Sequence, residues 1–456
     1  MDLKENPKED ILMGILKGWN ELAVTTACNI NCIFCSRKFN PFKSHYSHRK
    51  FTDIKAELRL FNPNNTIHVN ASVSRLTDGE PFTHPRIWDI LKLIREYFPY
   101  RGLEKFSDRL YITTNGTYLT KDYLKRLEKL KGVRLIHSIN STDVKDWMKL
   151  SNASKKLAEI ATNVPRMIGD FNLDYIPSIV ALPKIVGFDG IEKTITDLDN
   201  CGVKTLRVFL PTYTKYASKK EQEIMQCDKD QLFDLINKLS KKVNMKILIY
   251  PQVFEDVTPK LEGYENIKIY PSDKIISINK VRIFSRAHAQ RCLLRNRISI
   301  VHLKSGEKEK KVIVYSKNIK NVNYIDERIN KDCPFVPKDI ESATKSYKNI
   351  LVLHSVTGKK AIRAAFKKSI EWSEKLQDKK FYFQTVYNDF YGGSVMCGGL
   401  LMCSDYKKYL QKFIDKKFKP DLVLMSRSSF DLLGRDLLKD SIYEVCEELG
   451  VEFKIV

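Results

Sequence analysis

The sequence predicts an α/β protein that begins with a partial (β/α) TIM-type barrel and continues into a small β-rich module and a second α/β region. Short β-branched or apolar runs alternate with helical patterns from about residue 21 to 250, and again from about residue 345. Such alternation is typical of parallel sheets with helical crossovers. Between these regions the apolar runs are short and separated by turn residues. We therefore expect domains at 1–250, 255–318 and 345–456.

Seven runs in the first region have the length and β-branched content of strands. They are residues 21–27, 66–72, 110–115, 134–140, 175–182, 205–211 and 245–250. Apolar residues at helical spacing lie between them at 85–98, 121–132 and 190–202. These repeated βα units predict the barrel.

The two later regions differ in pattern. The β-rich module has strand candidates only, at 265–270, 273–284, 297–304 and 310–317. The last region has strand candidates at 349–356, 381–388, 421–426 and 453–456, and helix candidates at 359–376 and 439–450. We expect a separate α/β domain there.

The composition indicates a folded protein with a basic surface. The chain has 456 residues, of which 43% are hydrophobic, enough for the cores of two or three domains. Its net charge of +23 could attract nucleic acid, an acidic protein or an anionic surface, but lysines are spread along the chain as on any solvated surface. The 10 cysteines are scattered except for one trio, and no apolar run is long enough to span a bilayer. We expect a cytoplasmic protein with no membrane contact.

Three cysteines lie on one short loop after the first predicted strand. Cys28, Cys32 and Cys35 have the spacing Cys-x3-Cys-x2-Cys, with Phe34 before the last thiol. Three thiolates can hold three irons of a cubane and leave the fourth iron open to an outside ligand. This loop resembles the signature loop of the radical S-adenosylmethionine (SAM) superfamily, in which the open iron chelates the cofactor's methionine amino and carboxylate groups. The resemblance implies a 4Fe–4S cluster on these cysteines, with SAM as cofactor and Phe34 beside it.

A structural zinc site is the alternative interpretation of the trio. Zinc also binds thiolates and needs one more ligand, which His45 or His48 could supply. The motifs that follow favour the cluster, because they stand in the order found in the superfamily and a zinc site would require none of them.

The second predicted strand leads into Thr-Asp-Gly-Glu-Pro at 77–81. This stretch resembles the superfamily's Gly-Gly-Glu-Pro, with Asp78 in place of the first glycine. The resemblance implies that the backbone at Gly79 and the carboxylate of Glu80 receive the cofactor's ammonium through charge-assisted hydrogen bonds. Standing alone, such a segment would be a polar turn before a helix.

The next strands carry further candidates. The third ends in Thr-Asn-Gly, a strand end that resembles the superfamily's and implies that Asn115 faces the cofactor pocket; alone, Asn-Gly is a common turn. Ser138 and Asn140 alternate on the fourth, so both can face the barrel interior and reach the cofactor's ribose or carboxylate. Their other interpretation is a hydrogen-bonded strand end. Residues 176–195 resemble the superfamily's strand and loop that pack against adenine.

The regions after the barrel resemble known modules. Residues 264–317 resemble a PDZ domain, and 273–289 have that family's order of strand, turn, strand and helix. PDZ domains bind extended peptides at a sheet edge, but the glycine-rich carboxylate-binding loop is not evident, and a structural spacer is the alternative. The last hundred or so residues resemble an uncharacterised C-terminal domain of radical SAM proteins that carry a PDZ module. There, Asn388, Gly392 and Gly393 could let the backbone approach a ligand, or form a tight turn. A second metal site is another hypothesis, in which Cys397 and Cys403 are joined by either of two further cysteines; buried, unligated thiols are the commoner arrangement. The two further cysteines are Cys292 and Cys333.

The resemblance implies reductive cleavage of SAM to a 5′-deoxyadenosyl radical, which abstracts hydrogen from a substrate. We expect a peptide or protein substrate and a flavodoxin or ferredoxin as electron donor. No catalytic residue beyond the cofactor site can be assigned. The alternatives are a cobalamin-assisted methyltransferase, although no Asp-x-His-x-x-Gly stretch is present; an RNA-modifying enzyme; and an inactive PDZ-bearing binding protein, against which the cysteine trio and Glu80 argue.

Overall fold

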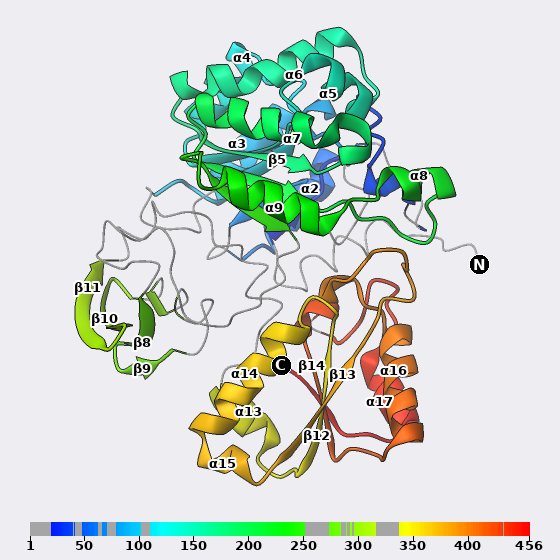
Figure 1. The fold of residues 1–456 in the computed structure, drawn as a ribbon. Helices are drawn as coiled ribbons and strands as arrows, with labels where there is room; N and C mark the ends of the chain where they lie inside the picture. Colours follow the sequence, from blue (N-terminus) through cyan, green and yellow to red (C-terminus); the bar gives the residue numbers. More distant parts are fainter. Residues whose placement is uncertain are drawn as a thin grey trace. The chain divides into compact units, whose positions relative to one another are not determined.

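The structure of the protein is a computed structural model (Figure 1). It describes residues 20–39, 41, 48–62, 66–70, 79–101, 110–250, 273–283, 289, 292–293, 296–315, 337–431 and 433–456. The chain forms two compact units, one of residues 1–252 with 391–395 and the other of residues 253–390 with 396–456. Among the described helices, none combines the length and apolar character needed to cross a bilayer.

The first unit is built on a parallel sheet of seven strands in sequential order. Each strand pairs with the next along the chain, and within the described residues β1 and β7 are the two edges. The α/β fold with an open parallel sheet is thus confirmed. The strands are β1 (Asn20–Leu22), β2 (Ile67–Val69), β3 (Leu110–Thr114), β4 (Val133–Ser138), β5 (Asp174–Val180), β6 (Thr205–Phe209) and β7 (Lys246–Tyr250).

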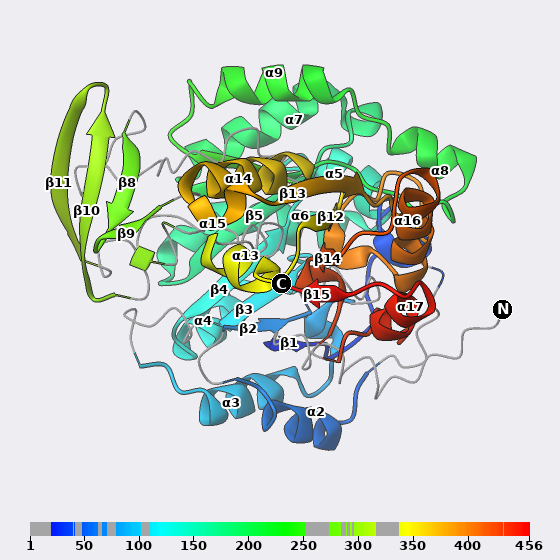
Figure 2. The same ribbon diagram turned by 90° about the horizontal axis from the view of Figure 1, so that it is seen from below.

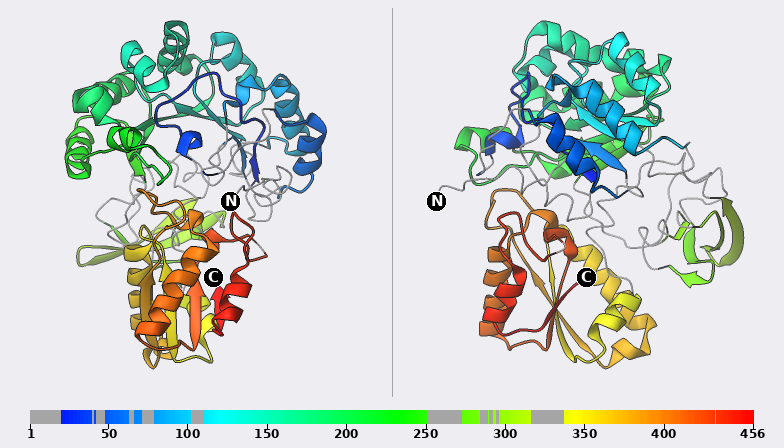
Figure 3. Two further views of the ribbon diagram at one scale, coloured as in Figure 1. Left: turned by 90° about the vertical axis from the view of Figure 1, so that its right-hand side faces the viewer. Right: turned by 180° about the vertical axis from the view of Figure 1, so that it is seen from behind.

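Helices cover the outer face of this sheet (Figure 3, left). Alternate strand residues such as Ile67, Leu135 and Val208 are buried against them, as the period of two in a strand requires. The helices are α2 (Phe51–Leu58), α3 (Ile87–Tyr97), α4 (Lys121–Lys129), α5 (Val144–Ser151), α6 (Lys155–Met167), α7 (Pro183–Asn200), α8 (Lys219–Ile224) and α9 (Lys229–Leu239).

The inner face of the same sheet is polar. Glu21, His68, Tyr111, Arg134 and Asp174 are register partners on five successive strands, so their side chains share this face. The His68 and Tyr111 rings stack with centroids 4.4 Å apart, and Arg134 donates to the Tyr111 hydroxyl at 2.9 Å and pairs with Asp174. The barrel interior is therefore lined by hydrogen-bonding groups.

A four-stranded antiparallel sheet follows, in the order β11-β10-β8-β9 (Figure 2). Its inner face packs into a small apolar cluster that includes Ile278, Val301 and Val314. The predicted strand at 265–270 lies outside the described residues, and the PDZ resemblance stays a prediction. The strands are β8 (Lys274–Ile278), β9 (Val281–Arg282), β10 (Ile298–Ser305) and β11 (Lys308–Tyr315).

The last part of the chain contains a parallel sheet in the order β13-β12-β14-β15. Helices cover both of its faces (Figure 3, right), with α14 packed in one apolar cluster and α16 and α17 in the other. The strands are β12 (Asn349–His354), β13 (Lys380–Thr385), β14 (Leu422–Met425) and β15 (Phe453–Ile455). The helices are α13 (Pro337–Thr344), α14 (Lys359–Trp372), α15 (Glu374–Gln377), α16 (Cys403–Lys416) and α17 (Ile442–Glu448).

Candidate cofactor site

The loop that carries the cysteine trio is held by its backbone. The amide of Asn31 donates to the carbonyl of Ser151 at 3.0 Å, and that of Ile33 to Leu150 at 3.0 Å, so the loop is fixed to the last turn of α5. After the last thiol, the amide of Lys38 donates to the carbonyl of Cys35 at 3.0 Å. These bonds fix the loop's path without using any thiol.

The three thiols form one electrostatic group. Burial raises the pKa of Cys28 and Cys32. The charges of Glu80 and Cys35 raise that of Cys28 further, and the charges of Cys35 and Cys28 raise that of Cys32. A bound cation reverses this effect, because it stabilises the thiolate form. Within the described residues, no three His, Cys, Asp or Glu side chains are already arranged around a metal-sized centre. The loop fits a cluster by its donor chemistry and its fixed backbone, and Cys28, Cys32 and Cys35 would hold it.

Asn115, predicted to face the cofactor pocket, lies against this loop. Its Nδ2 donates to the Asn29 side-chain oxygen at 3.0 Å and lies 3.7 Å from the Cys28 sulfur. Its Oδ1 accepts from the backbone amide of Thr117 at 3.0 Å. The end of β3 and the cysteine loop thus form one corner of the barrel mouth.

Glu80 is buried, with 2% exposure. One carboxylate oxygen accepts from the Thr114 hydroxyl at 2.8 Å and the Phe82 amide at 3.2 Å, and the other accepts from the Asn115 amide at 2.6 Å. Burial raises the pKa of Glu80 to about 7, and these three bonds oppose that shift. The carboxylate therefore links its own turn to the end of β3.

Gly79 is required by the close approach of two backbones. A Cβ at this position would lie 2.0 Å from the carbonyl oxygen of Ala27. The Gly79 amide donates to Thr25 at 2.9 Å, and the Glu80 amide to Ala27 at 2.8 Å. No side chain fits where this segment crosses the start of the cysteine loop. Asp78 lies outside the described residues.

Sequence reasoning missed Asn70, whose side chain joins three segments of the site. Its Oδ1 accepts from the Val24 amide at 2.7 Å, and its Nδ2 donates to the carbonyls of Thr25 at 2.9 Å and Gly79 at 3.0 Å. The residue has a φ of 47°, a conformation that asparagine tolerates better than most residues. An asparagine directly after a buried strand was the available signal.

The two β4 candidates have different surroundings. Ser138 ends β4, and its hydroxyl lies 3.5 Å from that of Ser178. Asn140 has a φ of 57°; its side chain donates to the Ser138 carbonyl at 2.9 Å and accepts from the Val180 amide at 3.0 Å. Asn140 thus joins the ends of β4 and β5. Contact of Ser138 and Asn140 with the cofactor stays a prediction.

Phe34 is half-buried in an apolar cluster that also contains Phe39, Leu150 and Leu182, beside the cysteine loop.

The segment at 176–195 was expected as a strand followed by a loop, and the loop is wrong. Helix α7 begins at Pro183 and continues through Gly187, whose φ of 70° kinks it. Proline at the first helical position favours this early start.

A buried histidine beneath the site was also missed. His137 is fully buried, and its Nδ1 lies 2.8 Å from the Tyr175 hydroxyl. A Cβ at Gly116, which has a φ of 82°, would lie 2.1 Å from His137 Nε2. The glycine of Thr-Asn-Gly therefore makes room for the imidazole, and burial lowers the pKa of His137 to about 3.

The other metal hypotheses gain no support. His48, a candidate zinc ligand, has its Nδ1 2.9 Å from the Thr25 hydroxyl, and His45 lies outside the described residues. The thiol of Cys403 donates to the carbonyl of Asp440 at 3.1 Å, as a buried structural cysteine does. Cys333 lies outside the described residues. No described group of three such ligands includes Cys292 or Cys397.

In the C-terminal sequence, Asn388 is buried and its Nδ2 donates to the Leu400 carbonyl at 2.6 Å. Gly392 and Gly393 have φ values of 62° and 60°. These three residues have the features of a tight, packed turn.

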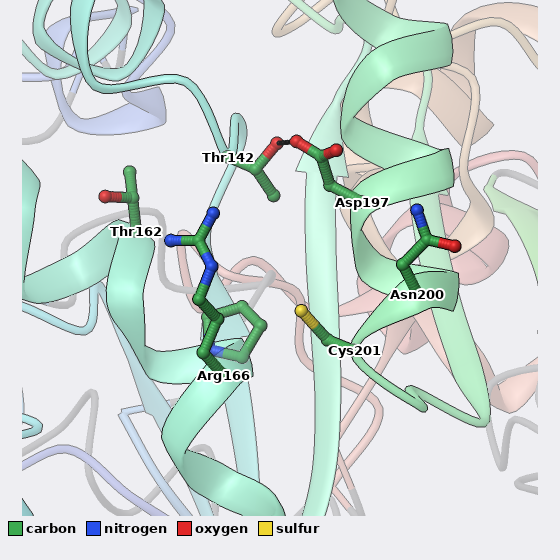
Figure 4. Close-up of a pocket in the computed structure, with 7 residues that line it drawn as sticks. Thr142, Thr162, Arg166, Asp197, Asn200 and Cys201 are labelled. Carbon is green, nitrogen blue, oxygen red and sulfur yellow. Dashed lines mark hydrogen bonds between the residues drawn. The ribbon is translucent and has the colours of Figure 1, made fainter.

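A cavity of about 500 Å³ lies on the helical side of the first unit (Figure 4). Its walls include Arg166 of α6, Asp197 of α7 and the half-buried thiol of Cys201; the Thr142 hydroxyl donates to Asp197 at 2.7 Å. None of the predicted cofactor-site residues lines it. The candidate site is therefore separate from this cavity.

Comparison with known proteins identifies the first region. Residues 22–183 match the model of the Radical SAM superfamily, and no curated protein matches the chain. Similar solved structures include Streptococcus suis SuiB bound to its precursor peptide SuiA, at 15% identity and a TM-score of 0.37, covering 50% of this chain and 48% of SuiB. Another is a radical SAM methyltransferase from Sphaerobacter thermophilus, at 12% identity and a TM-score of 0.37, covering 50% of this chain and 65% of that one. The chain thus spans about half the length of SuiB. Over residues 22–183 the chain is therefore similar to the Radical SAM superfamily, whose enzymes use a 4Fe–4S cluster and SAM as cofactors.

Proposed function

We propose that this protein binds a 4Fe–4S cluster through Cys28, Cys32 and Cys35, cleaves SAM reductively, and modifies a peptide or protein. The observation that carries the proposal is the match over residues 22–183, which contains the cysteine trio, Glu80 and Asn115. When bound, the cluster supplies the electron that breaks the cofactor's sulfonium bond and so yields a deoxyadenosyl radical.

The protein's own residues have a positioning role in this proposal. Glu80 and the Gly79 backbone receive the ammonium of SAM, while Asn115 and Asn29 hold the loop beside β3. Because such a radical reacts with almost any C–H bond, selectivity depends on position and on exclusion of water. The polar inner face offers hydrogen-bonding groups that can orient a substrate.

The proposal extends to partners and compartment. The charge of +23 favours an acidic electron donor such as a flavodoxin or ferredoxin. Seven cysteines of the described residues, including the trio, are free thiols, which supports a reducing cytoplasm. A peptide substrate is supported by the β8–β11 sheet, whose edge strands can pair with an extended chain.

Anaerobic reconstitution of the full chain with iron and sulfide tests the proposal. With SAM and dithionite, we expect 5′-deoxyadenosine by mass analysis and about four irons per chain. S-adenosylhomocysteine as the main product would instead indicate methyl transfer. Zinc on the loop, with no cofactor cleavage, would contradict the proposal.

A further inference from the structure

The outer face of the β8–β11 sheet carries a continuous apolar patch. Its members are Ile298, Ile300, Ile313 and Tyr315, which are 51%, 52%, 62% and 42% exposed. Ile298 pairs directly with Tyr315 and Ile300 with Ile313, so the four side chains form a two-by-two block on neighbouring strands. We name this block the outer isoleucine patch.

The core of the module does not need these side chains. The intervening residues Ser299, Val301 and Val314 are buried on the opposite face. A sheet with one face packed normally shows polar residues on the other. A block of large apolar side chains on the solvent face instead marks a surface that binds a partner.

The charged residues described in this module are mostly basic. Further along the same face as the outer isoleucine patch, His302 pairs with Lys311 in register and Lys304 with Glu309, and the Glu309 carboxylate lies 2.8 Å from the His302 ring. The described residues of the module contain eight Lys or Arg and three Asp or Glu. One of those acids, Asp273, is fully buried and paired with Lys310. A second copy of this face would bring like charges together, whereas an acidic partner would be attracted.

The patch also reaches β11, which is an edge strand among the described strands of this sheet. In the order β11-β10-β8-β9, the only described strand beside β11 is β10. A strand added to this edge would place alternate side chains opposite Lys311, Ile313 and Tyr315. The first position favours an acid and the other two favour apolar side chains.

We propose that β11 binds an extended polypeptide segment with an acidic residue and, two and four positions away from it on one side, aliphatic residues. The segment adds a strand to the edge and extends the outer isoleucine patch. This surface differs from the groove between strand and helix that a PDZ domain uses. The inference extends the proposed function by naming the polypeptide, and its test measures binding alone, so the two can fail separately.

The probe is a fluorescein-labelled peptide of about ten residues with glutamate and isoleucine at this spacing, titrated against the full chain by anisotropy. We expect Ile300→Thr/Ile313→Thr to weaken binding about tenfold or more, since threonine keeps strand propensity but removes apolar area. Leu60→Thr, at a site 61% exposed in the first unit, is the matched control and should leave binding unchanged.

Charge exchange sharpens the test. Lys311→Glu should weaken binding of the glutamate peptide several-fold and strengthen binding of a peptide with lysine in place of the glutamate. Lys125→Glu on α4 should change neither affinity. Equal affinity of both peptides for the unmodified chain would overturn the proposal. The proposal would also be overturned if the double threonine variant bound the peptide as tightly as the unmodified chain does. The same holds if the unmodified chain sediments as a dimer that this variant does not form, or if flavodoxin displaces the peptide.

Discussion

The two parallel sheets of this molecule are built alike but used differently. In the C-terminal sheet, β12 and β14 are buried on both faces, with sequences NILVLH and LVLM that are almost wholly apolar. In the seven-stranded sheet, the described helices pack on the outer face, and β4 and β6 interrupt their apolar runs with Arg134 and Arg207 on the inner face. The uncovered face of a sheet is where polar side chains can serve chemistry, whereas a covered face serves stability.

The largest expected effect is at the mouth of the seven-stranded sheet. Cys32→Ala should abolish SAM cleavage while the circular dichroism of the protein stays unchanged, because the loop backbone does not depend on this thiol. The readout is 5′-deoxyadenosine after anaerobic reconstitution. Cys227→Ala, off the loop, should cleave normally; retained cleavage in Cys32→Ala would refute the ligand assignment.

In the covered sheet, a core substitution should affect stability alone. Leu353 is fully buried in β12, so Leu353→Ala should lower the free energy of unfolding of this domain by about 3 kcal/mol. Leu433→Ala, at a position 50% exposed, should cost less than about 0.5 kcal/mol. Urea unfolding followed by amide hydrogen exchange in β12 measures both. SAM cleavage per folded molecule should be unchanged. A loss of cleavage would contradict the assignment of stability to the C-terminal sheet and chemistry to the seven-stranded sheet.

Alanine substitutions at two glycines of the barrel distinguish the cost of conformational strain from the cost of a steric clash. Gly116 and Gly202 have similar positive φ values, 82° and 74°, but a Cβ at Gly116 would meet His137, and one at Gly202 would meet no atom within 4 Å. Both alanine variants should lose about 1 kcal/mol from strain. Gly116→Ala should lose roughly 2 kcal/mol more from overpacking. Equal thermal shifts would show that His137 moves away freely.

The smallest effect is on the pH dependence of the covered sheet. Burial lowers the pKa of His354 to about 4 from a usual value near 6.5. The unfolded chain therefore binds the proton first, so stability is full above pH 6.5 and falls as the pH drops toward 4. The expected loss between pH 8 and pH 5 is about 2 kcal/mol. In urea unfolding, His354→Leu should not show this loss of stability between pH 8 and pH 5. If its free energy of unfolding fell with pH as steeply as that of the unmodified protein, the loss could not be assigned to His354.

Local pattern was enough to predict much of the fold. Each of the seven barrel strands lies within or beside a predicted run, because β-branched runs and their spacing are properties of neighbouring residues. The spacing of Cys28, Cys32 and Cys35 is likewise local. Helices α5 and α6 were not predicted, although they lie between two correctly placed strands. The helix predicted at 190–202 is present in α7, but its first residues, 183–189, were expected as a loop because the N-terminal signal of Pro183 was not used.

The parts of the site that sequence reasoning missed depend on distant contacts. Asn70 contacts Val24 and Thr25, some 45 residues earlier, and nothing in its neighbourhood specifies that bridge. Glu80 was predicted to receive the cofactor's ammonium, but its hydrogen bonds to Thr114 and Asn115 depend on how β3 packs beside it. Tertiary packing decides such contacts, and one sequence does not record it.

The backbone anchors of the cysteine loop bear on maturation of the protein. Asn31 and Ile33 attach the loop to α5 through main-chain bonds that need neither iron nor sulfide. The main-chain path of the loop is therefore set by the polypeptide itself, and the proposed cluster would bind to a loop that is already held in place.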